Sequence, residues 1–334
     1  MKFALWNVEL SRAGPGLLAR DIASGKDAQI LAALRVMAAL DADILLLTGV
    51  DYDRELIAAG LLADRLAVLG ADYPHRFALR PNAGWQTGQD LDGDGQPGGP
   101  GDAQGWGQFS GQGEMLLLSR LPLGPAATDH SAFLWADLPG ALLPPDMTAG
   151  VREVQRLSST GHWQVPLLLP DGKSLTLLAW HATPPVFDGP EDRNGRRNHD
   201  EAAFWLALLE RRLPGLAPPE GAFVLLGTAN LDPEDGEGRR DAVRALLSHP
   251  LLQDLSPRSS VTPPPDPGQK GDAALDTAVF AQTGGLRVEL LLPSAGVTVL
   301  SSGVMRAPEG TPEAARLSAA SRHFPVWAII DPAG

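Results

Sequence analysis

The sequence contains no cysteine, so disulfides, thiolate metal sites and cysteine nucleophiles are all excluded. Basic residues are also scarce, because 27 lysines and arginines stand against 40 aspartates and glutamates, which gives a formal net charge of −13. A protein that binds duplex DNA without sequence preference normally offers a basic face. The composition therefore disfavours a nucleic-acid partner without excluding one.

Long hydrophobic runs are missing as well. No apolar run reaches the length of a membrane span, and the N-terminus enters a strand-like run at Lys2 without the apolar core of a signal peptide. We therefore expect a cytoplasmic protein with no membrane partner, and an exported location stays open. We also expect the protein to be a monomer.

Short apolar runs that are typical of buried strands recur along the whole chain. They span residues 2–9, 44–50, 115–119, 163–169, 175–181, 223–226, 286–292, 297–300 and 326–330. Helical spacing of apolar residues occurs between them, at 27–40, 53–69, 199–213 and 239–247. This mixture predicts an α/β sandwich rather than a wholly parallel wound sheet.

Two further segments are predicted to be long loops. Residues 82–113 are crowded with glycine, and residues 256–272 are rich in proline, serine and charge. We nevertheless expect a single domain over residues 1–334. The candidate site residues are spread from Asn7 to His323, so a domain boundary would divide them.

Polar side chains stand where several of the strand-like runs end or begin. They are Asn7, Asp51, His181, Asn230, Asp232 and His323. If the runs lie beside one another in sheets, these side chains form a rim around one cleft. Asparagine, aspartate and histidine gathered in one place indicate metal-assisted hydrolysis of a phosphate ester.

Each of these residues also has a purely structural explanation. His181 precedes Pro184 and Pro185, which stiffen the exit from the strand, so its imidazole either binds phosphoryl oxygens and transfers protons or caps the strand. Asn230 holds a phosphate oxygen or the attacking water, and Asp232 ligates a hard cation, unless both cap the turn after their strand.

Basic residues near the same runs are candidates for binding the substrate phosphate. Arg322 either clamps a phosphate bidentately or belongs to a surface turn. Arg193 and His199 lie in a charged segment that forms either a phosphate pocket or a self-neutralising loop. Asn198 is the predicted N-cap of the following helix, with Glu201 three residues later.

The first long loop contains a calcium-like motif. Asp90, Asp92 and Asp94 have the carboxylate spacing of a calcium-binding loop, and Gly95 has the glycine position. An EF-hand has glutamate at the twelfth position, where this chain has Gly101. The motif predicts either a structural Ca²⁺ that orders the loop or a flexible acidic turn.

Taken together, these features resemble the endonuclease/exonuclease/phosphatase superfamily over nearly the whole chain. The resemblance rests on Trp6-Asn7, on His181 with its proline pair, on the Gly-x-x-Asn turn that ends at Asn230, and on the terminal Ser-x-His that ends at His323. Residues 183–201 and 288–294 resemble a bacterial branch of that superfamily. The resemblance implies a DNase-I-like fold, which is a four-layer αββα sandwich of two mixed β-sheets flanked by helices.

The resemblance also implies a chemistry, in which Mg²⁺ or Mn²⁺ polarises a phosphoester and activates the attacking water. By position, His181 and His323 would stabilise the transition state, Asn230 would hold the scissile phosphate, and Asn7 would lie near the metal. The substrate would be a small-molecule or extended phosphoester. A phosphatase or phosphodiesterase is therefore expected before a nuclease.

Four acidic positions of the superfamily pattern are changed in this chain. The residues at these positions are Gly49, Thr228, Arg322 and the longer acid Glu289. Arg322 occupies the position of the acid that is expected to partner the final histidine. Asp51, two residues after Gly49, is expected to replace the missing glutamate, with Asp232 or Glu9 in support. Because carboxylates hold a divalent cation, a non-catalytic, phosphoester-binding member stays open beside the hydrolase, as does a DNA or RNA nuclease.

Overall fold

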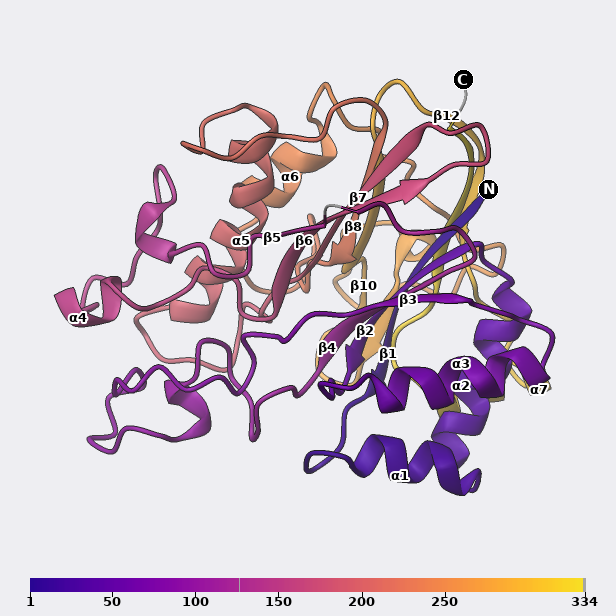
Figure 1. Cartoon of the computed structure of the whole chain (residues 1–334), viewed down its shortest axis with the longest axis horizontal. Helices are drawn as coiled ribbons and strands as arrows, with labels where there is room; N and C mark the ends of the chain where they lie inside the picture. Colours follow the sequence, from indigo (N-terminus) through magenta and orange to yellow (C-terminus); the bar gives the residue numbers. More distant parts are fainter. Residues whose placement is uncertain (126, 333–334) are drawn as a thin grey trace.

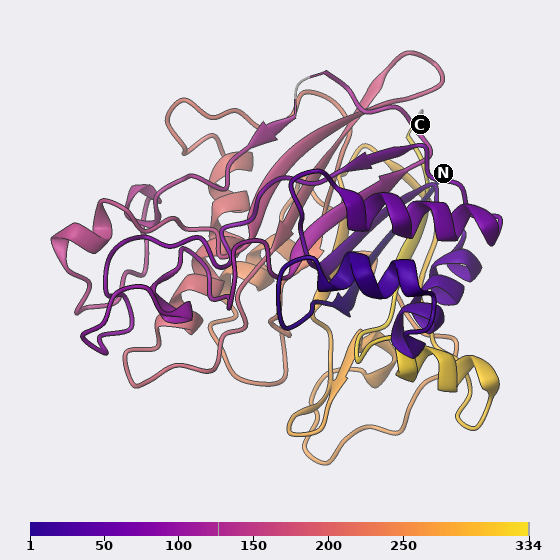
Figure 2. The same ribbon diagram turned by 60° about the horizontal axis from the view of Figure 1, so that its bottom comes forward.

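The computed structural model describes residues 1–125 and 127–332 and has four layers. Two β-sheets face each other in the middle, and helices cover the outer face of each sheet (Figure 1). The same order of layers is visible after rotation of the molecule (Figure 2). This arrangement confirms the predicted four-layer sandwich.

The first sheet has six strands, and β1 and β2 at its centre are parallel while their neighbours are antiparallel. In order across the sheet, the strands are β12 (Thr298–Val304), β13 (Val326–Asp331), β1 (Lys2–Leu10), β2 (Ile44–Val50), β4 (Glu114–Ser119) and β3 (His75–Phe77).

The second sheet has five strands and is also mixed, because β7 and β8 are parallel. Its strands are β11 (Glu289–Pro293), β8 (Phe223–Thr228), β7 (Ser174–His181), β6 (Gly161–Leu168) and β5 (Thr128–Asp129). A separate two-stranded sheet pairs β9 (Ala278–Phe280) with β10 (Gly284–Leu286).

The apolar runs form strands because both faces of each sheet are covered. In β1, Phe3 and Leu5 belong to the core between the two sheets, whereas Ala4 and Trp6 belong to the core under the helices. Alternate side chains of a strand point to opposite faces, so a doubly covered strand needs apolar residues at nearly every position. Strand β7 follows the same rule, with Leu177 facing the other sheet.

The helices divide between the two outer layers. The first sheet is covered by α1 (Leu17–Ser24), α2 (Ala28–Leu40), α3 (Ile57–Val68) and α7 (Pro312–Ala320). The second sheet is covered by α5 (Arg193–Leu209) and α6 (Asp241–Leu247), and the short α4 (Ala149–Arg152) precedes β6. No helix of the described residues is both long and apolar enough to cross a membrane.

The structure differs from the predicted elements at several places. The expected strand 286–292 is divided, because Leu286 ends β10 in the small sheet and Glu289 begins β11 in the second sheet. Helices α1 and α7 were not predicted. The expected loop 82–113 contains one short 3₁₀ helix, Pro100–Asp102, and the expected loop 256–272 contains none of the named helices or strands.

Candidate active site

The carboxyl ends of β1 and β2 meet those of β7 and β8 between the two sheets. The hydroxyl of Thr48 at the end of β2 hydrogen-bonds that of Thr228 at the end of β8, with 2.8 Å between the oxygens. Asn7 pairs in register with Thr48, and His181 pairs in register with Thr228. The sandwich therefore brings Asn7 and His181 to the same end of the two sheets, as the sequence predicted for strand-end residues.

His323 is held at this end by a buried carboxylate. Its Nδ1 atom lies 2.6 Å from Oε1 of Glu289, and the two side chains are 3% and 0% exposed. The indole Nε1 of Trp6 donates to the His323 carbonyl at 2.8 Å, which fixes the backbone. The partner of the final histidine is therefore Glu289, and the expectation that Arg322 stands at the partner position is wrong.

His181 is close enough to His323 for their charges to interact. Burial, and to a smaller extent the positive charge of His323, lower the pKa of His181 to about 4, against the opposite effect of the Gly113 backbone. The Nδ1 atom of His181 is buried without a hydrogen-bond partner among the described residues. His181 is therefore a neutral imidazole near pH 7, with an unsatisfied ring nitrogen.

Asn230 lies beside His181. Its Nδ2 atom donates to the carbonyl of Ala182, the residue that follows His181, at 2.8 Å. Its backbone is left-handed, with a φ of 52°, a conformation that asparagine tolerates better than most residues. The turn after β8 therefore places the Asn230 amide next to the end of β7.

Arg322 forms an ion pair with Glu9 and binds both of its oxygens, Oε1 through the guanidinium and Oε2 through the backbone. The guanidinium donates through Nε to Oε1 of Glu9 at 2.9 Å and also through Nη2, while the Arg322 backbone N–H donates to Oε2 at 2.8 Å. Ser321 Oγ lies 2.7 Å from the Asn7 carbonyl and 3.0 Å from Oε2 of Glu9, so its single hydrogen has two acceptors within reach. We call Asn7, Glu9, His181, Asn230, Glu289, Arg322 and His323 the strand-end site.

Both carboxylate oxygens of Asp51 accept hydrogen bonds from the surrounding loops. Its Oδ1 accepts from Ser11 Oγ at 2.7 Å and from the Gly113 N–H at 3.1 Å, and its Oδ2 accepts from the Arg12 N–H at 2.7 Å. Burial raises its pKa, against the effect of these hydrogen bonds. Both carboxylate oxygens thus serve to tie three loops together.

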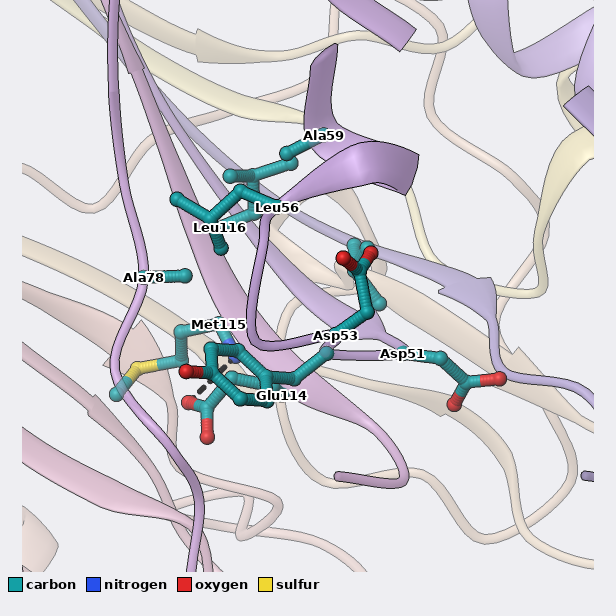
Figure 3. A pocket seen from close by; sticks show the side chains of 10 residues that line it. Asp51, Asp53, Leu56, Ala59, Ala78, Glu114, Met115 and Leu116 are labelled. Carbon is teal, nitrogen blue, oxygen red and sulfur yellow. Dashed lines mark hydrogen bonds between the residues drawn. The ribbon is translucent and has the colours of Figure 1, made fainter. Parts of the chain in front are cut away.

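Asp51 also borders a small cavity of about 10 Å³, which is shown in Figure 3. Its carboxylate points away from the labelled apolar side chains there. Glu114 lines the same cavity, and burial raises its pKa well above the ordinary value. Its Oε1 accepts from the Met115 N–H, whereas its Oε2 has no partner among the described residues.

Asp232 is likewise committed to its own turn. It accepts from the backbone N–H groups of Glu234, Asp235 and Arg287 at 2.6 to 2.7 Å. Burial raises its pKa, with Asp235 adding a like charge. The structural explanation of this aspartate as a turn cap therefore accounts for its bonds to Glu234 and Asp235, and the bond to Arg287 joins the turn to the segment before β11.

The predicted phosphate ligands Arg193 and His199 lie apart, on helix α5. Arg193 donates to the carbonyl of Leu91 and to Oε1 of Gln155, and His199 Nδ1 lies 2.9 Å from Asp200. Helix α5 begins at Arg193, so the predicted N-cap at Asn198 is wrong.

Asn198 and Glu201 face inward from α5 and bind neighbouring loops. Asn198 Nδ2 donates to the carbonyls of Thr183 and Ala229, at 2.6 and 2.7 Å, which joins the segment after β7 to the segment after β8. Glu201 accepts from the backbone of Thr183 at 2.7 Å. The motif that the sequence presented as a helix start therefore supports the residues around His181 and Asn230.

An acidic cluster lies in the first long loop. Ligand atoms of Asp90, Asp92 and Asp102 lie within 4.8 Å of one another, and this is the only such group of three in the described part of the chain. The sequence predicted Asp94 as the third member, but Asp102 replaces it. Asp94 Oδ1 instead accepts from the N–H of Gln96 at 2.7 Å.

Sequence reasoning missed the two acid pairings of the site, Glu9 with Arg322 and Glu289 with His323. Glu9 was considered only as a supporting metal ligand, and Glu289 only as a changed acid. The signal that could have found the first pair is the simultaneous presence of a free acid at position 9 and a new cation at position 322, where the superfamily pattern has an acid.

Comparison with known proteins identifies the relationship. The model of the endonuclease/exonuclease/phosphatase family matches residues 4–323. No curated protein matches the chain in sequence.

The chain is also similar to solved structures. One is an endonuclease/exonuclease/phosphatase from Beutenbergia cavernae DSM 12333, with 16% identity, a TM-score of 0.56, and coverage of 99% of this chain and 71% of that one. A family protein from Leptotrichia buccalis C-1013-b has 15% identity, a TM-score of 0.55 and 99% coverage of both chains. A mannosyl-6-phosphatase from Bacteroides thetaiotaomicron VPI-5482 has 13% identity, a TM-score of 0.50 and 99% coverage of both chains. At these identities the similarity shows the fold.

Proposed function

The chain belongs to the endonuclease/exonuclease/phosphatase family, whose members are generally hydrolases, and from this premise we propose that it hydrolyses a phosphoester at the strand-end site. The observation that carries the proposal is the buried His323–Glu289 pair, 2.6 Å apart, placed within electrostatic range of a neutral His181. A carboxylate that orients one imidazole beside a second imidazole is suited to moving two protons in one reaction.

In the proposed reaction, the oxygen of a water attacks phosphorus while the bond from phosphorus to the leaving oxygen breaks. His181, which is neutral, accepts the proton of the water. His323 donates a proton to the leaving oxygen, and the buried Glu289 carboxylate balances the charge of the protonated imidazole. Asn230 and Asn7 offer amide groups at the strand ends that can hold phosphoryl oxygens.

The residues at the site do not fit the divalent ion that the family resemblance implies. Both oxygens of Asp51 and of Asp232 are occupied by donors of the chain, and the Glu9 carboxylate is paired with Arg322. Within the described residues, the acidic group with metal-like spacing lies in the loop at Asp90, away from the strand-end residues. We therefore route no step of the reaction through a metal.

The substrate proposed is a small-molecule or extended phosphoester, so the protein would act as a phosphatase or phosphodiesterase. Support comes from the excess of acidic residues, which disfavours a nucleic-acid substrate, and from the similar structure that is named a mannosyl-6-phosphatase.

A second candidate function is phosphoester binding without turnover. The observation that favours it is the set of positions where the superfamily pattern has acids and this chain has Gly49, Thr228 and Arg322. Such a protein would keep the site's amides and cation but would release no product.

The two candidates differ in one experiment. Release of product from p-nitrophenyl phosphate and bis(p-nitrophenyl) phosphate is compared for the wild type, His323→Gln and the control His75→Gln, which alters a histidine of the edge strand β3. The hydrolase proposal expects loss of about 10²-fold or more in His323→Gln, as for removal of a general acid, and no change in the control. Binding of the esters without product release would favour the second candidate.

A further inference from the structure

The carboxylate of Glu9 is oriented by the backbone as well as by its partner. Glu9 has a left-handed φ of 51° and lies at a bulge, because the pairing of β1 with β2 shifts between Asn7 and Leu10. Burial acts to raise its pKa, but the hydrogen bonds from Arg322, together with the charges of His323 and Arg322, lower it below its usual value. Glu9 is therefore a carboxylate anion whose counterion is the Arg322 guanidinium.

Two of the positions that lack their expected acids, Gly49 and Arg322, lie next to this anion. The backbone of Gly49 is so close that a Cβ atom there would lie 3.2 Å from the Glu9 nitrogen and 2.5 Å from Oδ1 of Asn7. Thr228 is bonded to Thr48, the neighbour of Gly49. Next to Glu9 the chain thus has a glycine and an arginine in place of two acids, and the third changed position, Thr228, bonds the residue before Gly49.

These changes agree electrostatically with one another. Carboxylates that hold a divalent cation repel each other when the cation is absent, so a site without that cation is more stable with fewer acids. The remaining acid, Glu9, and the guanidinium of Arg322 together have a net charge close to zero. A guanidinium also stays charged at every physiological pH.

The Arg322 guanidinium still has donors for a ligand. Nε and Nη2 bind Glu9, whereas Nη1 has no hydrogen-bond partner in the part of the chain that the structure describes, and the side chain is 64% exposed. The guanidinium lies 5.2 Å from the centre of the Phe280 ring, and the same ring packs edge-on against His323 at 5.4 Å. The phenyl ring therefore positions the cation beside the proposed proton donor.

We propose that the Arg322 guanidinium, anchored by Glu9 and Phe280, takes the place of a divalent cation at the strand-end site and binds the phosphoryl group of the substrate without metal. The inference rests on the proposed function only in taking a phosphoryl group as the ligand. A guanidinium has five N–H donors, so Nη1 and the second N–H of Nη2 can bind a phosphate through two parallel hydrogen bonds while Nε and Nη2 bind Glu9.

Binding of inorganic phosphate, measured by isothermal titration calorimetry, tests the proposal. The wild type is titrated in EDTA and again with Mg²⁺ or Mn²⁺ present, and we expect the same affinity in each. Arg322→Gln should bind phosphate at least about tenfold more weakly in EDTA, since a charge-assisted hydrogen bond is lost. Arg322→Lys, which keeps the charge without the planar fork, should lie between the two.

Arg35→Gln is the matched control, because Arg35 is an exposed arginine on α2, in the outer layer. The affinity of this variant for phosphate should equal that of the wild type. The proposal is overturned if phosphate binding needs the divalent ion, if Arg322→Gln binds as tightly as the wild type, or if the wild type does not bind phosphate in EDTA. Hydrolysis that depends on Mn²⁺ would contradict this inference and leave the proposed function intact. Phosphate binding in EDTA without hydrolysis of any ester would support this inference and contradict the proposed function.

Discussion

The Nδ1 atom of His323 and the Oε1 atom of Glu289 lie 2.6 Å apart inside the protein, although 34 residues separate them in the sequence. Glu289 begins β11 in the second sheet, whereas His323 precedes β13 in the first. The pair therefore spans the two sheets, and the packing of the sandwich determines the orientation of the imidazole. A change in the charge of Glu289 should therefore change the rate of turnover through its effect on His323.

Glu289→Gln should lower turnover by at least about tenfold, because the amide oxygen can still accept from Nδ1 but no longer balances a protonated imidazole. The affinity for phosphate should stay near the wild-type value. Steady-state hydrolysis of p-nitrophenyl phosphate, with calorimetry for phosphate, separates the two effects. If affinity and turnover fell together, Glu289 would be supporting the fold of the site rather than the proton transfer.

His181 should titrate with a pKa of about 4, because burial and the neighbouring charge of His323 disfavour its protonated form. The imidazole resonance of His181, assigned by its absence in His181→Gln, should stay at its neutral position as the pH falls from 7 to about 5. A midpoint near the ordinary value of 6.5 would show that the imidazole is not buried as described.

The same shift has a consequence for stability. Because the folded pKa lies below the unfolded pKa, the contribution of neutral His181 is fully present above about pH 6.5 and is lost as the pH falls toward 4. Urea unfolding at several pH values should show a loss on the order of 2 kcal/mol over this window in the wild type. That part of the loss should be missing in His181→Gln.

The sequence predicted the sandwich because the cause of the fold is local and repeated. Strands such as β1 are apolar on both faces, and that pattern is visible without any knowledge of their partners. The strand-end position of His181 and Asn7 follows from the same pattern. Periodicity therefore predicted which residues emerge at one end of the sheets.

The interactions of each emerging side chain could not be predicted in the same way. The Glu9–Arg322 pair joins residues 313 positions apart, and Glu9 lies at a bulge of β1 with a left-handed φ of 51°. The run 286–292 is divided between two sheets, and within the break the Arg287 N–H is bound by the distant Asp232. Such contacts are tertiary, so the pattern of one segment does not specify them.

Asp51→Asn provides a test of the predicted metal ligand. Because Asp51 accepts three hydrogen bonds from residues 11, 12 and 113, replacement of one oxygen by an amide nitrogen should cost roughly 1–3 kcal/mol of unfolding free energy. Any response of the protein to Mn²⁺ should be unchanged. Urea unfolding and hydrolysis with and without Mn²⁺ measure the two quantities.

Asp53→Asn is the natural comparison for Asp51→Asn. Asp53 is close in sequence and accepts from the N–H groups of Ile57 and Ala58, one through each oxygen, but unlike Asp51 it is partly exposed, so water can replace the acceptor that asparagine lacks. Its substitution should therefore change stability little. If Asp51→Asn instead left stability intact and weakened a Mn²⁺ response, Asp51 would return to the site as a metal ligand.

Gly49 is expected to resist every larger side chain, including the glutamate of the superfamily pattern. Its φ of 72° is strained for other residues, and a Cβ atom would lie 2.5 Å from Oδ1 of Asn7. Gly49→Ala should cost about 1–3 kcal/mol of unfolding free energy, measured by urea denaturation. Gly60→Ala, in the middle of α3 with open space around the Cβ position, should stabilise the protein by about 0.5–1 kcal/mol. Equal effects of the two substitutions would mean that the backbone at position 49 relaxes freely, and a glutamate restored there could then reach a metal.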